Sequence, residues 1–173
     1  MRFVRTLWLG FLAATSACAN GSEPYEPGAV AAAVREQWQA AEILVNGDDF
    51  TEPELRCIDS AGATVTADDI ASGGSQTFAE SPEEVQDFIE SYFDECLTDA
   101  HLQRWLYTDM TDRPDLAFTD EKSACLSQSL VGLVRREGFA AVFRDRTPSA
   151  AAELEKLRQA CGIFGPNSTT PTP

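Results

Sequence analysis

The stretch FTEPELRC at residues 50–57 recurs as FTDEKSAC at residues 118–125, and this repeated motif decides the fold. In each copy a Thr follows a Phe, at least one acidic residue comes next, and a Cys lies six residues after the Thr. Thr is a good helix N-cap, and the helix dipole favours acidic residues in the first turn. The first copy also places Glu54 where it completes a capping box with Thr51. The motif therefore predicts two capped helices, each carrying a Cys.

A second pattern follows each copy, in which residues at steps of 4, 3 and 4 form an apolar stripe that ends in another Cys. The two stripes are Val85, Ile89, Tyr92 and Cys96, and Ala150, Leu154, Leu157 and Cys161. These steps keep apolar side chains on one face of a helix. The sequence SPEE at residues 81–84 and the pair Thr147-Pro148 are typical helix starts, and Gly162 is a typical stop. Each motif is therefore expected to be followed by an amphipathic helix.

The cysteines of these patterns form an even set, which favours two disulfides in an oxidising compartment. Four cysteines permit three pairings, and the repeat favours Cys57–Cys96 and Cys125–Cys161, whose separations of 39 and 36 residues are similar. Chance similarity between short motifs is the alternative to duplication. The chain has no Cys-x-x-Cys pair and one histidine, so we expect no zinc site, no redox motif and no cofactor.

The N-terminus has the layout of an export signal. Two arginines within residues 1–5 precede an apolar run at residues 6–14 and then small residues. We expect a signal peptide over residues 1–17, with Cys18 as the lipid-bearing first residue of the mature protein. Residues 15–18 resemble a bacterial lipobox, although Thr15 stands where Leu is usual. Cleavage after Ala19, which would give a freely secreted protein, is the alternative.

The remainder of the chain is predicted to be all-α. We expect a flexible tether at residues 18–28, one helical domain at residues 29–164 with repeat units at about 50–97 and 118–162, and a disordered tail at residues 165–173. Further helices are expected at about 29–45, 99–107 and 123–143, the last broken or bent at Gly138. Residues 59–80 are expected to be irregular, with a short strand as an option at residues 63–66, and residues 109–114 a polar turn.

These features resemble small, acidic, alanine-rich envelope lipoproteins of high-GC bacteria such as actinobacteria, in which a Phe-Thr-x-x-Glu-x-x-Cys helix unit recurs. The resemblance covers residues 50–162 loosely, and the second copy departs from the unit in having Ser123 in place of Glu. It implies a place on the outer face of the cell membrane. It implies no activity, so no catalytic residue is carried over.

Charge is unevenly distributed along the chain, whose formal net charge is −15. Residues 20–99 hold 19 acidic residues against Arg35 and Arg56, whereas residues 100–173 balance nine acidic with nine basic residues. This acidity argues against nucleic acid as a partner, and it leaves the lipid on Cys18 as the contact with the membrane. The one basic cluster consists of Arg135, Arg136, Arg144 and Arg146. It is a candidate patch for an acidic ligand or partner, and pairing with the chain's own acidic half is the favoured alternative.

The sequence contains no recognisable catalytic constellation. His101 is the single histidine, no nucleophile turn accompanies it, and we expect it to be a partly exposed surface residue. The acidic clusters lack the spacing of a calcium loop, so no metal site is expected. The sequence therefore favours a lipid-anchored, non-enzymatic binding or scaffolding module, with an envelope protein as its candidate partner. An envelope enzyme or small-ligand carrier, with its site between the two halves, is the alternative.

Overall fold

A computed structural model describes residues 25–45, 47–73, 81–112 and 118–163. Within these residues all regular structure is helical, which confirms the all-α prediction. The α-helices are α1 (Ala29–Ala40), α2 (Glu52–Ala61), α3 (Ala67–Gly73), α4 (Glu83–Ser91), α5 (Asp99–Thr111), α6 (Asp120–Glu137) and α7 (Pro148–Ala160). Two single π turns, η2 (Tyr92–Cys96) and η4 (Ala140–Arg144), follow α4 and α6.

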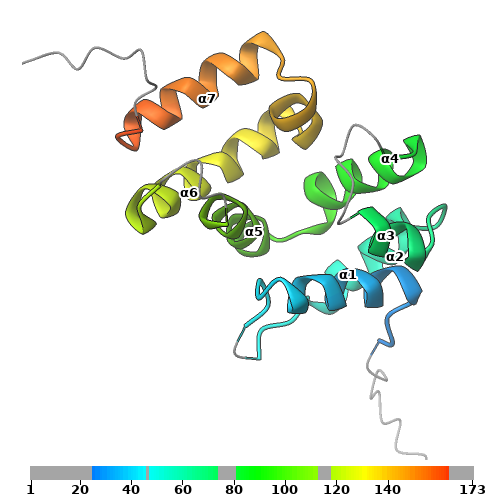
Figure 1. The fold of residues 1–173 in the computed structure, drawn as a ribbon. Helices are drawn as coiled ribbons and strands as arrows, with labels where there is room; N and C mark the ends of the chain where they lie inside the picture. The colour runs from blue at the N-terminus through cyan, green and yellow to red at the C-terminus, as the bar shows by residue number, and fades with distance from the viewer. Residues whose placement is uncertain (1–24, 46, 74–80, 113–117, 164–173) are drawn as a thin grey trace, which may run out of the picture.

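The helices lie in two groups joined through α5 (Figure 1). Helices α6 and α7 pack side by side at one end of the molecule, and α1, α2 and α3 pack together at the other. Helix α5 packs along α6, while η2 packs against α2. One continuous core of buried apolar side chains runs through both groups, so the described residues form one domain.

Each repeat unit has the same order of elements: a Thr-capped helix, a short helical segment and a second helical segment that ends at the partner Cys. The side chain of Thr51 accepts a hydrogen bond from the Glu54 N–H and completes the expected capping box. In the second unit Thr119 accepts from the Lys122 N–H. The disulfides join Cys57 to Cys96 and Cys125 to Cys161, the pairs that the repeat favours.

The prediction of a first helix at about residues 29–45 is wrong at its C-terminal end. Helix α1 ends at Ala40 and not near residue 45. Glu42 adopts a left-handed conformation with a φ of 55°. This turn lets the N–H groups of Ile43 and Leu44 donate to the Trp38 carbonyl. Both side chains then enter the core, and Trp38 is buried as expected. Burial of two apolar side chains offsets the cost of the turn.

The segment expected to be irregular at residues 59–80 is helical in part, and there the prediction is wrong. Residues 63–66 are irregular as expected, without the optional strand, but α2 extends to Ala61 and α3 follows residue 66, where Thr66 and Asp69 cap it reciprocally. Helix α5 continues to Thr111, through the start of the expected polar turn. The cap expected at Ser81 is also wrong: the N-cap of α4 is Pro82, without a side-chain hydrogen bond, while Ser81 is buried and its carbonyl accepts from Gln86.

The last residues of the expected tether are fixed to α2. Asp59 accepts hydrogen bonds from the Tyr25 hydroxyl at 2.6 Å and from the Gly28 N–H at 2.7 Å. The predicted flexibility is therefore wrong for residues 25–28, because these donors satisfy a helix-borne carboxylate. The expected signal peptide, Cys18, residues 18–24 of the tether and the tail at residues 165–173 lie outside the described residues.

Candidate functional site

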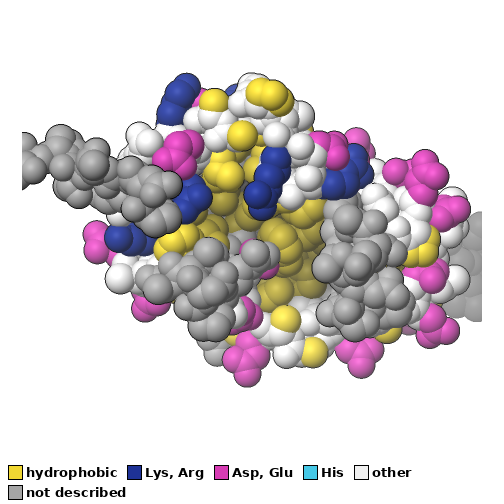
Figure 2. All heavy atoms as spheres, turned by 45° about the horizontal axis from the view of Figure 1, so that its top comes forward, with side chains coloured by type: hydrophobic (Ala, Val, Ile, Leu, Met, Phe, Trp, Pro, Cys, Tyr) yellow, Lys and Arg dark blue, Asp and Glu magenta, His cyan; other side chains and the backbone are white. Residues whose placement is uncertain are grey.

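A cavity of about 650 Å³ is lined by α1, α3, α4, η2 and α5 and by the segment around η4. Figure 2 shows hydrophobic side chains gathered in a hollow on one face of the molecule, with Lys or Arg side chains at its edge. The volume is within the range of roughly 300–1,000 Å³ that is typical of small-molecule sites. The described lining residues are Val34, Gln37, Trp38, Asp69, Ile70, Ser81, Val85, Phe88, Ile89, Tyr92, Phe93, Trp105, Asp109, Phe139, Phe143 and Arg146.

Aromatic rings from both repeat units form much of the lining, and the two π turns position several of them. Phe93 belongs to η2, Phe139 directly precedes η4 and Phe143 lies within it. The rings of Phe93 and Phe139 stack, with centroids 4.3 Å apart and planes 10° apart. Trp105 from α5 packs against Phe93 with centroids 4.4 Å apart. Because π turns occur frequently at functional sites, their shared position here marks the cavity as the candidate site.

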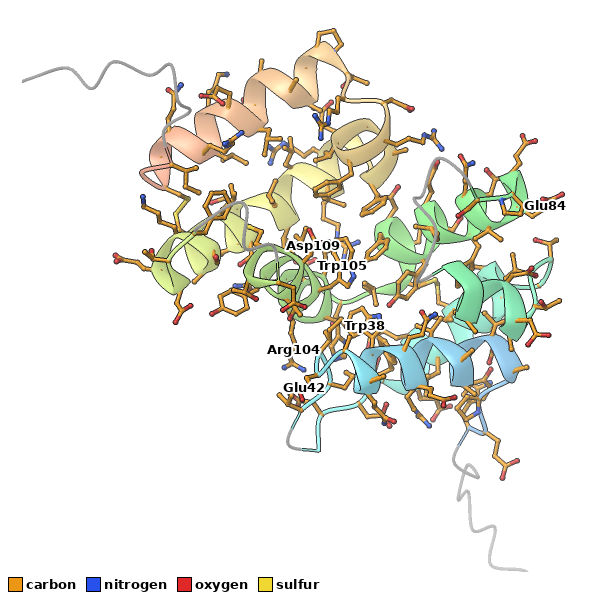
Figure 3. All side chains as sticks on the ribbon, viewed as in Figure 1. Trp38, Glu42, Glu84, Arg104, Trp105 and Asp109 are labelled. Atoms are coloured by element: carbon orange, nitrogen blue, oxygen red, sulfur yellow. A yellow bond between two sulfur atoms is a disulfide. The ribbon has the colours of Figure 1, made fainter. Side chains whose placement is uncertain are left out.

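The polar part of the lining comes from other elements. Figure 3 shows Trp105 and Asp109 on α5 above Trp38 of α1, and all three line the cavity. Asp69 lies on α3, where hydrogen bonds from the side chain and backbone of Thr66 lower its pKa. A mostly apolar wall with a few charged groups is the usual composition of a ligand site.

Tyr92 contributes its ring to the lining, while its hydroxyl is buried without a hydrogen-bond partner among the described residues. Burial, together with the nearby charge of Glu54, raises the pKa of Tyr92 well above its usual value. The hydroxyl is therefore neutral under ordinary conditions. Because its oxygen is sealed from solvent, we assign Tyr92 to the wall of the site and not to proton transfer.

The four arginines of the predicted basic patch differ in their contacts and do not all face the cavity. Arg135 donates to the carbonyls of Phe93, Asp94 and Leu97 and pairs with Asp99 at 3.0 Å, so it holds η2 against α6. Arg144 pairs with Glu90 and Asp145. These contacts agree with the alternative in which the cluster pairs with the chain's own acids. Arg136 is exposed on α6, and only Arg146 of the four lines the cavity.

The expected surface position of His101 is wrong, since the side chain is buried with Glu54. The Glu54 Oε1 lies 2.7 Å from His101 Nδ1 and 2.7 Å from the Thr98 N–H, and Oε2 accepts from Thr51. Burial acts to raise the pKa of Glu54, but these hydrogen bonds outweigh it and lower the pKa to about 2. An ionised Glu54 requires Nδ1 to be the donor. The pair joins α2 to α5 and lies outside the cavity lining, so its role is structural.

Two features that would define other types of site are absent from the described residues. No group of three or more His, Cys, Asp or Glu side chains there is arranged to hold a metal ion. No helix in this part of the chain has the length and apolar content needed to cross a bilayer.

Comparison with known proteins gives no relative. No protein-family model, no curated protein and no solved structure matches the chain. The cavity and its chemistry are therefore the basis for assigning a function.

Proposed function

We propose that this protein is an exported, lipid-anchored binding module that holds a small, largely apolar ligand in the cavity between its two disulfide-linked units. The observation that carries the proposal is the aromatic cavity of about 650 Å³, to which both units contribute. Such rings stabilise a bound ring system by dispersion and by stacking. Export is supported by the signal-like residues 1–17 and by the two disulfides, and anchoring by Cys18.

Binding fits the lining better than catalysis does. A hydrolase or transferase of the common kinds places a nucleophile beside a base, and His101 is held by Glu54 outside the cavity. The four described cysteines are joined in disulfides, which removes them as nucleophiles. The described lining instead supplies rings with a few charged groups, which is the chemistry of recognition.

A small ligand also fits the surface better than a protein scaffold does. Val45 is the one large hydrophobic side chain classed as exposed among the described residues, with 41% of its surface accessible. Stable protein interfaces have an apolar, well-packed centre, and a single exposed Val side chain does not supply one in this part of the chain. On the face that Figure 2 shows, hydrophobic side chains gather in the hollow, which is concave and therefore suits a small ligand.

The probe N-phenyl-1-naphthylamine tests the proposal, because it is neutral, aromatic and fluorescent in apolar surroundings. The mature chain carrying Cys18→Ser needs no detergent, and we expect it to bind one probe molecule saturably. Ile89→Phe enlarges a side chain of the cavity lining. Because the added ring fills part of the space that the probe occupies, the substitution should lower the affinity roughly tenfold. Val45→Phe adds the same ring at the exposed position outside the cavity and should leave the affinity unchanged. Non-saturable binding, or equal affinity in the two variants, would contradict the proposal.

The proposed lipid attachment at Cys18 is tested by the intact mass of the protein, extracted from membranes without reduction of its disulfides. We expect a mass that corresponds to a chain beginning at Cys18, with acyl groups attached and with two disulfides. A Cys18→Ser variant should appear in the soluble fraction and without the acyl mass. An unmodified wild-type chain that begins at residue 20 would show that the protein is secreted freely.

A further inference from the structure

Arg146 differs from most arginines of the described chain in its contacts. Five others pair with acidic side chains: Arg35 with Asp49, Arg56 with Glu52, Arg104 with Asp48, Arg135 with Asp99 and Arg144 with Glu90. The Arg146 side chain forms no ion pair or hydrogen bond with another described residue, a property that it shares with the side chains of Arg136 and Arg158. Of these three, only Arg146 lines the cavity. An exposed cation at an aromatic cavity in a strongly acidic protein needs a separate explanation.

The backbone at Arg146 is strained as well. Its φ is 47°, in the left-handed region that is unfavourable for residues other than Gly, Asn and Asp. Arg146 lies between η4, which carries Phe143, and Thr147, which caps α7. Glycine would adopt this conformation at lower cost. Strain of this kind gathers at ligand sites, where the surrounding structure holds a side chain in a required place.

We propose that Arg146 binds the anionic group of the ligand, whose aromatic body lies among the rings of the cavity. This inference rests on the proposed function and specifies the ligand class: a ring-containing organic acid that bears a carboxylate, sulfonate or phosphate. A guanidinium donates two parallel hydrogen bonds to such a group. The acids of the same lining, Asp69 and Asp109, belong to α3 and α5. Arg146, on the η4–α7 connection, is the one cationic side chain among the described lining residues, so the anionic group is placed at that edge.

Two probes with the same ring system isolate the anionic group. The probe 8-anilinonaphthalene-1-sulfonate is N-phenyl-1-naphthylamine with one added sulfonate. In the mature Cys18→Ser chain, we expect Arg146→Gln to weaken binding of the sulfonate probe about tenfold and to change binding of the neutral probe less than about twofold. Arg136→Gln removes the same charge at an exposed position outside the cavity, and it should change both affinities less than about twofold.

A second variant separates ligand binding from folding. Arg146→Gly removes the guanidinium and relieves the left-handed strain, so its Tm should be at or above that of the wild type. Its affinity for the sulfonate probe should fall as in Arg146→Gln. If the neutral probe binds but Arg146→Gln leaves the sulfonate affinity unchanged, or Arg136→Gln lowers it equally, the assignment of Arg146 is overturned while the cavity function stands. If the neutral probe does not bind the wild type, the proposed function itself fails.

Discussion

Replacement of Glu54 by alanine is expected to lower the free energy of unfolding by about 3–5 kcal/mol. The carboxylate is 2% exposed and accepts hydrogen bonds from Thr98, His101 and Thr51. Its removal leaves the buried His101 side chain without its partner, which costs more than the lost bond itself, and it also removes the hydrogen bonds from the exposed residues Thr51 and Thr98. Urea unfolding measures the change. Glu52→Ala is the matched control, because Glu52 lies on the same helix but is exposed in an i,i+4 pair, and its loss should cost under about 0.5 kcal/mol.

The contribution of Glu54 also has a defined pH dependence. Its pKa of about 2 in the folded protein lies below the ordinary value of 4.5. The ionised form is therefore the one that folding favours, and the stabilisation is complete above pH 4.5 and is lost as the pH falls towards 2. Above pH 4.5 this ionisation contributes about 3 kcal/mol to the free energy of unfolding. Glu54→Gln removes the titrating group, so wild type and variant should differ most near neutral pH and converge at acidic pH. A difference in the free energy of unfolding that does not change with pH would contradict a lowered pKa for Glu54.

Removal of the first disulfide by the double substitution Cys57→Ala and Cys96→Ala is expected to lower the free energy of unfolding by about 3–4 kcal/mol. The bond closes a loop between residues 39 positions apart, so its loss gives the unfolded chain more conformations. The variant should carry Cys18→Ser, which prevents new pairing. Urea unfolding against the Cys18→Ser parent gives the difference.

The second disulfide provides the comparison. Its separation of 36 residues is nearly the same, and because the entropy depends on the logarithm of loop length, Cys125→Ala with Cys161→Ala should cost about as much. A cost below about 1 kcal/mol for either pair would mean that the corresponding unit is held by its packing alone.

Most helix starts were predictable because the signals that mark them are local. Thr51, Thr119 and Thr147 each accept the expected backbone hydrogen bond, and Gly138 ends α6 with a φ of 88°. A cap and its helix are separated by three residues, so one short window contains all the information. Helix α3 had such a signal too, in the Thr66–Asp69 spacing, and it was missed among the glycines and serines that follow.

The other errors arise from contacts between distant parts of the chain. Nothing near His101 indicates burial, because its partner Glu54 lies 47 residues earlier. The early end of α1 depends on a left-handed Glu42, which a helix-forming residue does not predict. Likewise, the aromatic residues that line the cavity come from several elements. In the sequence, each of these residues by itself indicates only a core position. A sequence pattern gives the face of one helix but not which faces meet.

The location of a bound probe tests the central claim most directly. Trp8 lies in the expected signal peptide, whereas Trp38 and Trp105 both line the cavity. Energy transfer from tryptophan to N-phenyl-1-naphthylamine should therefore rise on titration of the mature chain, saturate at one probe per chain and weaken in Ile89→Phe. A probe that binds without quenching tryptophan, or that quenches it equally in Ile89→Phe, would place the ligand elsewhere and contradict a binding cavity between the two units.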